Sequence, residues 1–148
     1  MNEGDGGRGG TPARLPVFVY GTLRPGRCNH DRFLGGRTVA EVPARMRDVV
    51  LYEGPGYPYA VARPGGEVRG ELVTVDPERY EEVLAALDVL EGCRPGDPGR
   101  SLYDRVVREA LVEDGGAVRA WVYLAAERVA RRLRLSGTLV RGGEWPGR

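Results

Sequence analysis

The stretch LPVFVYGTLRPG, residues 15–26, decides the fold and contains the first candidate site. Its first part, Leu15–Gly21, is a β-branched and aromatic run that ends in glycine, a pattern typical of a buried β-strand. A strand that turns sharply after its Tyr-Gly pair can present successive backbone N–H groups, such as those of Thr22 and Leu23, as a concavity that binds anions. On spacing alone, an ordinary strand-to-loop turn whose glycine serves only the backbone is the favoured interpretation.

Further along the chain, short segments of strand character alternate with turns. Asn29 is a good N-cap for a short helix over residues 30–34, which Gly35 and Gly36 end. The motifs GPGYP and RPGG, and the sequence DGG at Asp114–Gly116, are typical of turns because glycine supplies positive φ and proline fixes its own φ. Short strands at this spacing favour a closed or nearly closed antiparallel sheet. The expected strands are Thr38–Ala44, Val49–Glu53, Tyr59–Arg63, Glu67–Val75, Tyr103–Val112 and Ala117–Leu124.

One segment has clear helical periodicity. Asp76 is the expected N-cap, Pro77 is the first helical residue, and Gly92 stands at the end. The apolar residues that recur at helical spacing between them are Tyr80, Val83, Leu84, Leu87 and Leu90. A loop rich in proline and glycine, Cys93–Arg100, follows the helix. Nearer the C-terminus, Ala125–Leu135 is compatible with a helix, and the residues after it are expected to be irregular.

Glu91 departs from this apolar pattern. It follows Leu87 by four residues and Leu84 by seven, so it falls on the helix face that those leucines use. It also lies in the last turn, where the negative end of the helix dipole disfavours a carboxylate by about 0.3–1 kcal/mol. Both effects raise its pKa above the free value of about 4.3, which suits proton transfer near neutral pH. On the pattern alone, the favoured alternative is that the helix ends a residue earlier and Glu91 points to water.

Length and composition place the chain in an ordinary class. Its 148 residues, with 41% hydrophobic and 29% charged residues, fit one globular domain, which we expect over residues 15–146. Met1–Arg14 is rich in glycine and has no apolar core, so it is predicted to be a disordered tail rather than a signal peptide, and a cytoplasmic location is expected. No apolar run approaches the 18 residues or so that a membrane span needs.

The scarce residue types exclude several function classes. Every basic residue is arginine, so no lysine can form a Schiff base, and the 22 basic residues nearly balance 21 acidic ones spread along the chain. A nucleic-acid-binding protein would show a local basic surplus. The pair Cys28 and His30 falls short of a metal-ligand set. The single histidine could join Ser101 or Ser136 in a triad, but neither serine lies in a nucleophile-elbow pattern.

Several short motifs occur together in a fixed order. They are Tyr20, Gly21, Thr22 and Leu23 with Gly26, Asn29 and His30; then Gly56–Pro58, Val68–Asp76, Leu87–Gly92, Tyr103–Arg105, Val122–Leu124 and Gly142–Trp145. Each is weak alone. Together they resemble the gamma-glutamylcyclotransferase-like family, and most closely its short bacterial and gamma-glutamylamine branch. The resemblance extends from about Pro16 to Trp145.

The resemblance implies an α+β fold, a small mixed β-barrel of about six strands flanked by helices. It implies a reaction in which the α-amine of a gamma-glutamyl group attacks its own side-chain carbonyl, giving 5-oxoproline and a released amine or amino acid. No cofactor and no metal are implied, and the partner is a small gamma-glutamyl substrate bound by a monomer or homodimer.

The same resemblance assigns roles to particular residues. Glu91 aligns with the family's acidic residue and is the expected catalytic group. Substrate would contact the Tyr20–Leu23 loop, made of Tyr20, Gly21, Thr22 and Leu23, through backbone donors, with the Tyr103 hydroxyl lining the cavity. Arg24 follows the motif directly, but as one arginine among 22 it is expected to be solvated. The loop Cys93–Arg100 departs from the family, since it is longer and richer in proline and glycine than the minimal connection from the acidic residue to the tyrosine, and it is expected to border the pocket.

Two alternatives remain open at this point. One is a non-catalytic member that keeps the barrel and pocket as a small-molecule-binding or accessory protein. Retention of both the Tyr-Gly-Thr-Leu sequence and Glu91 argues against it. The other is an enzyme that cleaves or transfers an amide in the same pocket without closing a ring, which would release glutamate rather than 5-oxoproline.

Overall fold

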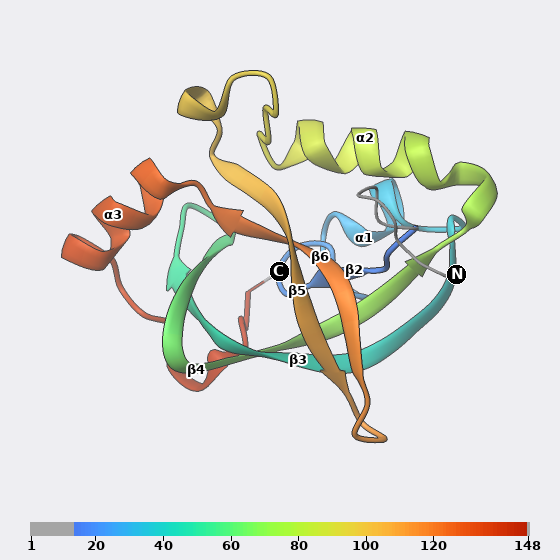
Figure 1. Cartoon of the computed structure of the whole chain (residues 1–148), viewed down its shortest axis with the longest axis horizontal. Coiled ribbons are helices and arrows are strands. Elements are labelled where there is room, and N and C mark those ends of the chain that lie inside the picture. The colour runs from blue at the N-terminus through green and yellow to red at the C-terminus, as the bar shows by residue number, and fades with distance from the viewer. Residues whose placement is uncertain (1–13, 148) are drawn as a thin grey trace, which may run out of the picture.

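The computed structural model describes residues 14–147, so the predicted tail lies outside the described residues except for Arg14. Five strands form a closed barrel in the order β2-β4-β3-β5-β6, and helices lie around it (Figure 1). This α+β barrel confirms the expected fold class. The strands are β2 (Val17–Val19), β3 (Thr38–Glu53), β4 (Pro58–Val75), β5 (Tyr103–Val112) and β6 (Ala117–Ala125).

The barrel has five strands rather than about six because four of the expected segments join into two long strands. β3 continues through a bulge at Asp48, whose φ is 62°. β4 continues through the RPGG motif, so the turn predicted there is wrong. The two irregularities are coupled, since the Asp48 Oδ1 atom accepts a hydrogen bond from the Gly65 backbone N–H at 2.9 Å. A bulge increases the local twist and bends the strand, which helps a sheet to close.

The short strand β2 closes the barrel. It pairs antiparallel with β4 and parallel with β6, where Val17 lies opposite Trp121. The Trp121 backbone N–H also donates to the Pro16 carbonyl at 2.8 Å. β2 ends at Val19, two residues before the predicted end, and the chain leaves the sheet at Tyr20. The predicted anion-binding loop therefore starts at the point where the first strand leaves the barrel.

Helices cover one side of the barrel. Asp76 caps the 3-10 turn η1 (Pro77–Arg79) by accepting from the Glu78 N–H at 3.0 Å, as predicted, and α2 (Tyr80–Leu90) continues from it. α2 lies beside the short helix α1 (His30–Phe33) above the barrel (Figure 1). The predicted side-chain cap of α1 is wrong: the Asn29 amide instead donates to the Thr22 hydroxyl at 2.9 Å.

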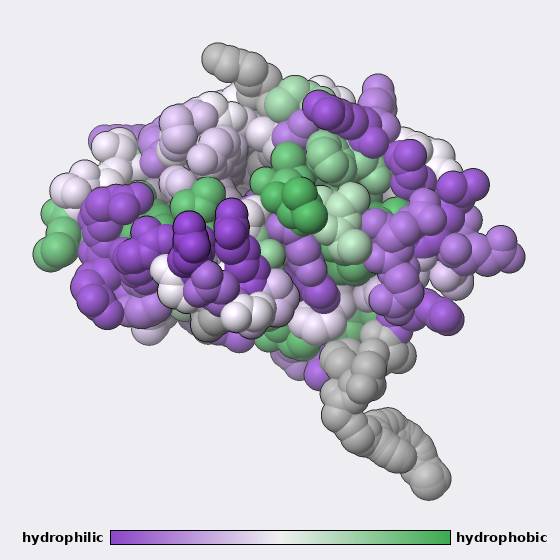
Figure 2. Space-filling model, turned by 90° about the horizontal axis from the view of Figure 1, so that it is seen from above, coloured by the Kyte–Doolittle hydropathy of each residue, from purple (hydrophilic) through white to green (hydrophobic). Residues whose placement is uncertain are grey.

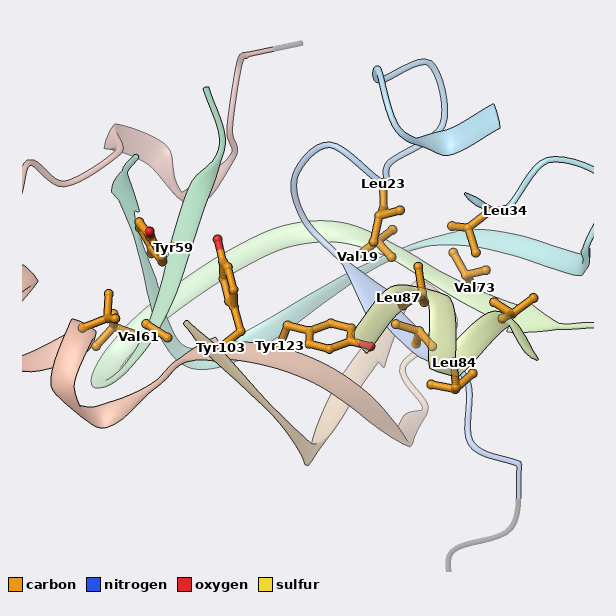
Figure 3. Close-up of a cluster of buried hydrophobic side chains, with 14 of the residues drawn as sticks. Val19, Leu23, Leu34, Tyr59, Val61, Val73, Leu84, Leu87, Tyr103 and Tyr123 are labelled. Atoms are coloured by element: carbon orange, nitrogen blue, oxygen red, sulfur yellow. The ribbon is translucent and has the colours of Figure 1, made fainter. Parts of the chain in front are cut away.

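Alternating side chains divide the core into two clusters. Val17 and Val19 pack with residues of α2 and α3 (Glu127–Ser136), whereas Phe18 and Tyr20 pack in a cluster that contains no helical residue. This is the period-two alternation of a strand that is buried on both faces. Figure 3 shows the first cluster, with Leu84 and Leu87 on α2 near Val19 on β2.

The C-terminal region resolves what the sequence left ambiguous. Ala125–Leu135 is a helix over most of its length, α3, and the irregular segment that follows holds one 3-10 turn, η3 (Arg141–Gly143). Val140 and Trp145 in this segment are buried in the second cluster. The segment is therefore part of the core. Three further residues, not expected from the pattern to be regular, form the 3-10 turn η2 (Pro98–Arg100) in the connection from α2 to β5.

The surface is mostly hydrophilic, and Figure 2 shows hydrophobic areas scattered over the face seen from above. The most exposed large hydrophobic side chains are Leu135 and Val89, at 84% and 82%. Within residues 14–147, none of the helices has the length and apolar character needed to cross a membrane.

Candidate active site

A cavity with a volume of about 230 Å³ opens where β2 leaves the barrel. All six residues predicted for the site line it: Glu91, Tyr20, Gly21, Thr22, Leu23 and Tyr103. They come from three separate parts of the chain, namely the loop after β2, the end of α2 and the start of β5. The structure thus brings the predicted residues together, while their roles in a reaction stay predictions.

Glu91 stands at the C-cap of α2. The helix ends at Leu90, one residue before Glu91, as the alternative interpretation required. The side chain nevertheless lines the cavity instead of pointing only to water. The residue is partly exposed there, and burial of its carboxyl group raises the pKa to about 7. A carboxyl with this pKa is present in both protonation states near neutral pH, which is the property a proton-transfer group needs.

The raised pKa of Glu91 predicts a pH dependence of stability. Between about pH 4.5 and pH 7, the unfolded chain has lost this proton while the folded protein still holds it. The free energy of unfolding should therefore fall as the pH rises through this window, by about 2–3 kcal/mol for this group, and level off above it. Urea unfolding of wild type and Glu91→Gln at pH 4 to 8 isolates the effect, because the other titrations, including that of His30, are common to both proteins. Parallel pH profiles would contradict the assignment.

The Tyr20–Leu23 loop packs directly against the first residue of β4, Pro58. A Cβ atom on Gly21 would lie 2.9 Å from the Cδ atom of the Pro58 ring, so this approach requires glycine. Among residues 14–147, the backbone N–H groups of Gly21, Thr22 and Leu23 have no hydrogen-bond acceptor. Unpaired amides beside a cavity are available to an anionic ligand.

Two buried hydroxyl groups hold the walls of the cavity. Tyr20 donates to the Tyr123 carbonyl at 2.6 Å, and Tyr103 donates to the Pro58 carbonyl at 2.7 Å. Burial, followed by the nearby Glu91 carboxylate, raises the pKa of Tyr20 well above its usual value. Burial likewise raises the pKa of Tyr103, with smaller contributions from Tyr20 and then Glu91. Both side chains are therefore neutral hydrogen-bond donors near neutral pH. Figure 3 shows Tyr103 beside Tyr59, which stacks on it with ring centroids 5.1 Å apart.

Sequence reasoning missed several lining residues. The cavity is also lined by Phe18, Val19, Cys28, Asn29, Gly56, Tyr57, Pro58, Leu90, Leu102 and Tyr123. Tyr123 is the most informative of them, because its backbone carbonyl accepts from Tyr20 and its hydroxyl donates to Asp88 Oδ1 at 2.7 Å. Its place within the motif Val122–Leu124 was the available signal, but only the pairing of β6 with β5 places it at the site.

Two expectations about the surroundings of the site are wrong. Arg24 is not solvated: its side chain is 11% exposed and forms a bidentate ion pair with Glu71 at 2.7 and 3.0 Å, with Glu144 a further 3.0 Å contact. The two carboxylates that pair with the Arg24 guanidinium group compensate for the burial of its charge. Among the described side chains of the loop Cys93–Arg100, none lines the cavity, although Glu91 and Leu102 on either side of it do, and the Leu102 N–H donates to the Gly92 carbonyl at 3.0 Å across its base. Among residues 14–147, no three His, Cys, Asp or Glu side chains gather as metal ligands.

Comparison with known proteins places this barrel in a family. A sequence model described as "Gamma-glutamyl cyclotransferase, AIG2-like" matches residues 17–147. The chain belongs to this family.

Individual relatives span a wide range of organisms. A Drosophila melanogaster protein named "Putative gamma-glutamylcyclotransferase CG2811" is 35% identical over 123 residues, covering 73% of this chain and 68% of that protein. A Niallia circulans protein named gamma-L-glutamyl-butirosin B gamma-glutamyl cyclotransferase is 35% identical over 109 residues, and the match covers 73% of this chain and 65% of that protein. The crystal structure of an AIG2-like protein from Mus musculus superposes with a TM-score of 0.66 at 28% identity, covering 88% of this chain and 87% of that one.

Proposed function

We propose that the protein is a gamma-glutamyl cyclotransferase that releases an amine or amino acid from a gamma-glutamyl amide and forms 5-oxoproline. One observation carries the proposal above all others: a carboxyl group with a pKa of about 7 shares a cavity with three backbone amides that have no acceptor among residues 14–147. Membership of the family and the names of its relatives support the same activity.

The proposed reaction needs a bent substrate and one shared proton. The neutral α-amine of the substrate attacks the γ-carbonyl carbon, and a new C–N bond closes a five-membered ring. Glu91, as the carboxylate, takes the proton that the attacking nitrogen sheds. It then gives this proton to the departing nitrogen as the original C–N bond breaks, so the carboxylate is restored. Because the substrate supplies its own nucleophile, the proposed reaction uses no cofactor, and the protein contributes position and proton transfer.

The Tyr20–Leu23 loop has the complementary role in this proposal. The negative charge of the substrate is on its α-carboxylate, and further negative charge develops on the γ-carbonyl oxygen as the ring closes. The amides of Gly21, Thr22 and Leu23 would donate to these oxygens, which stabilises the transition state more than the bound substrate. Tyr103 acts indirectly in this scheme, because its hydroxyl already donates to the Pro58 carbonyl and so fixes the cavity wall against Gly21.

Two other functions would use the same cavity. A binding or accessory protein would hold a gamma-glutamyl compound without turning it over, and an amide-cleaving enzyme would release glutamate. Ionisation of Glu91 in this cavity lowers the stability of the folded protein. A protein that only binds its ligand does not need a carboxyl group that is half-protonated at neutral pH, so this group favours catalysis over binding alone.

The test is a product assay. Purified protein is incubated with a panel of gamma-glutamyl amines and dipeptides, and mass spectrometry quantifies 5-oxoproline and glutamate. We expect 5-oxoproline in equimolar amount with the released amine for at least one substrate. If the product is glutamate, the protein is an amide-cleaving enzyme rather than a cyclotransferase. If a gamma-glutamyl compound binds but no product forms, the accessory-protein alternative is favoured.

A further inference from the structure

A cluster of three side chains joins α2 to the two strands beneath the cavity, and neither Asp88 nor Arg105 in it lines the cavity. Asp88 lies one helical turn before Glu91. Its Oδ1 and Oδ2 atoms accept from the Nε and Nη2 atoms of Arg105 on β5 at 2.8 and 3.1 Å. Oδ1 also accepts from the Tyr123 hydroxyl at 2.7 Å. Three charge-assisted hydrogen bonds thus converge on one carboxylate.

The cluster is largely shielded from solvent. The side chains of Asp88 and Arg105 are 17% and 22% exposed, and the guanidinium carbon of Arg105 lies 4.3 Å from the ring centroid of Trp121. Stacking on the ring keeps the fork of Arg105 flat and aimed at α2. Partial burial of the ion pair also makes the loss of either partner costly, since the other charge is then left unpaired.

Tyr123 links this cluster to the opposite wall of the cavity. Its hydroxyl donates to Asp88 on α2, while its backbone carbonyl accepts from the Tyr20 hydroxyl at the start of the Tyr20–Leu23 loop. Figure 3 shows the ring extending from β6 toward α2. One residue therefore connects helix α2, which ends just before Glu91, with the loop that lines the opposite side of the cavity.

We propose that Asp88 and Arg105 are positioning residues, which lock the last turn of α2 onto β5 and β6 and so fix the distance of the Glu91 carboxyl from the Tyr20–Leu23 loop. The inference rests on the proposed function for its catalytic consequence. A carboxyl that must reach two nitrogens in turn tolerates little displacement, and a shift of about 1 Å can cost about 100-fold in rate. The fold alone does not require this pair, because the hydrogen-bonded barrel and the packed leucines of α2 hold the helix approximately in place.

The experiment is a double-mutant cycle with Asp88→Asn, Arg105→Gln and the double variant. Each single substitution leaves one charge unpaired near Glu91, whereas the double variant removes both charges together. Glutamine at position 105 has no guanidinium group. It can therefore neither donate the two parallel hydrogen bonds to residue 88 nor stack over Trp121 as arginine does. We expect kcat on the best gamma-glutamyl substrate to fall about 100-fold in the double variant, with KM changed less than about threefold. The effects of the two single changes should be strongly non-additive.

A second measurement does not depend on turnover. Carbon-13 NMR of labelled glutamate side chains follows the titration of Glu91. The titratable groups that share the cavity with Glu91 are Cys28, Tyr57, Tyr20, Tyr103 and Tyr123. Burial raises the pKa values of the last three, so their hydroxyls stay neutral near pH 7. In the double variant, displacement of Glu91 toward solvent should lower its pKa by about one unit or more. If wild type forms no 5-oxoproline while this shift occurs, the proposed function fails and the positioning role stands.

Controls separate positioning from general damage. Glu67→Gln removes a carboxylate from a comparable 2.8 Å contact with Arg45, away from the cavity, and should leave kcat and the Glu91 titration unchanged. Arg105→Lys keeps the charge without the bidentate fork and serves as a milder variant if Asp88→Asn does not fold; about a tenfold loss of kcat is expected. A double variant that keeps both kcat and the Glu91 pKa of wild type, or one whose KM rises while kcat does not change, would overturn the proposal.

Discussion

Glu91→Gln should reduce kcat by about 1,000-fold or more while leaving the fold intact. The amide has nearly the shape of the carboxyl but can neither take a proton from the attacking nitrogen nor return one to the departing nitrogen, and a positioned acid-base group contributes about 100- to 10,000-fold. Since the Glu91 side chain has no hydrogen-bond partner among residues 14–147, the substitution breaks no side-chain hydrogen bond there. It also removes the cost of ionising a buried carboxyl, so the variant should be more stable than wild type above pH 7.

Steady-state kinetics at several pH values measure this effect. In wild type, kcat/KM should rise with pH and reach half its limit near pH 7, because the carboxylate form of Glu91 accepts the proton. The acidic limb should disappear from the residual activity of Glu91→Gln. Glu81→Gln is the matched control, since Glu81 is an exposed residue in the first turn of the same helix. Substrate binding should persist in both variants. A Glu91→Gln protein with near-wild-type rates would remove Glu91 from the mechanism.

Patterns of one or a few residues predicted most of the fold. The run Leu15–Gly21 predicted a strand. The Asp76-Pro77 pair and the spacing of the leucines predicted the helix before Glu91. Both predictions succeeded because local propensity and burial agree at these positions. The number of strands was harder to predict. Asp48 and Gly65 bend two neighbouring strands together, and this coupling depends on the register between β3 and β4. A turn motif within a paired strand looks the same in sequence as a turn between strands.

The site was predictable from a local signal at Glu91 together with the resemblance to a known family, which supplied the roles of the other site residues. Glu91 stood out because a carboxyl on an apolar helix face violates the pattern. Asp88 and Arg105 did not, since an acidic residue in a helix and an arginine in a strand are common, and 17 residues separate them. Arg24 shows the same limit in the opposite direction, because only its partners Glu71 and Glu144, both distant in the sequence, explain its burial. Pairings between elements determine which charges act together, and one sequence does not contain them.

Gly70→Ala should destabilise the protein more than any other single change to a glycine that lacks positive φ. A Cβ atom at this position would lie 2.0 Å from the carbonyl oxygen of Val19 and 3.1 Å from the Phe18 ring. The first contact is with backbone, so no side-chain rotation relieves it, and β2 must move away from β4. Close-packed interiors resist such a shift, and a loss of about 3 kcal/mol or more is expected.

The displacement would also reach the cavity. Val19 is the last residue of β2, and the Tyr20–Leu23 loop begins directly after it, so a strand forced outward carries the loop amides with it. Thermal unfolding should show a fall in Tm of about 10 °C, and the folded fraction should have a lower kcat. Gly96→Ala is the control, because a Cβ atom there meets no atom within 4 Å. Equal Tm values for the two variants would mean that β2 and β4 do not approach this closely, and the loop would then lack the fixed base that the proposed ring closure requires.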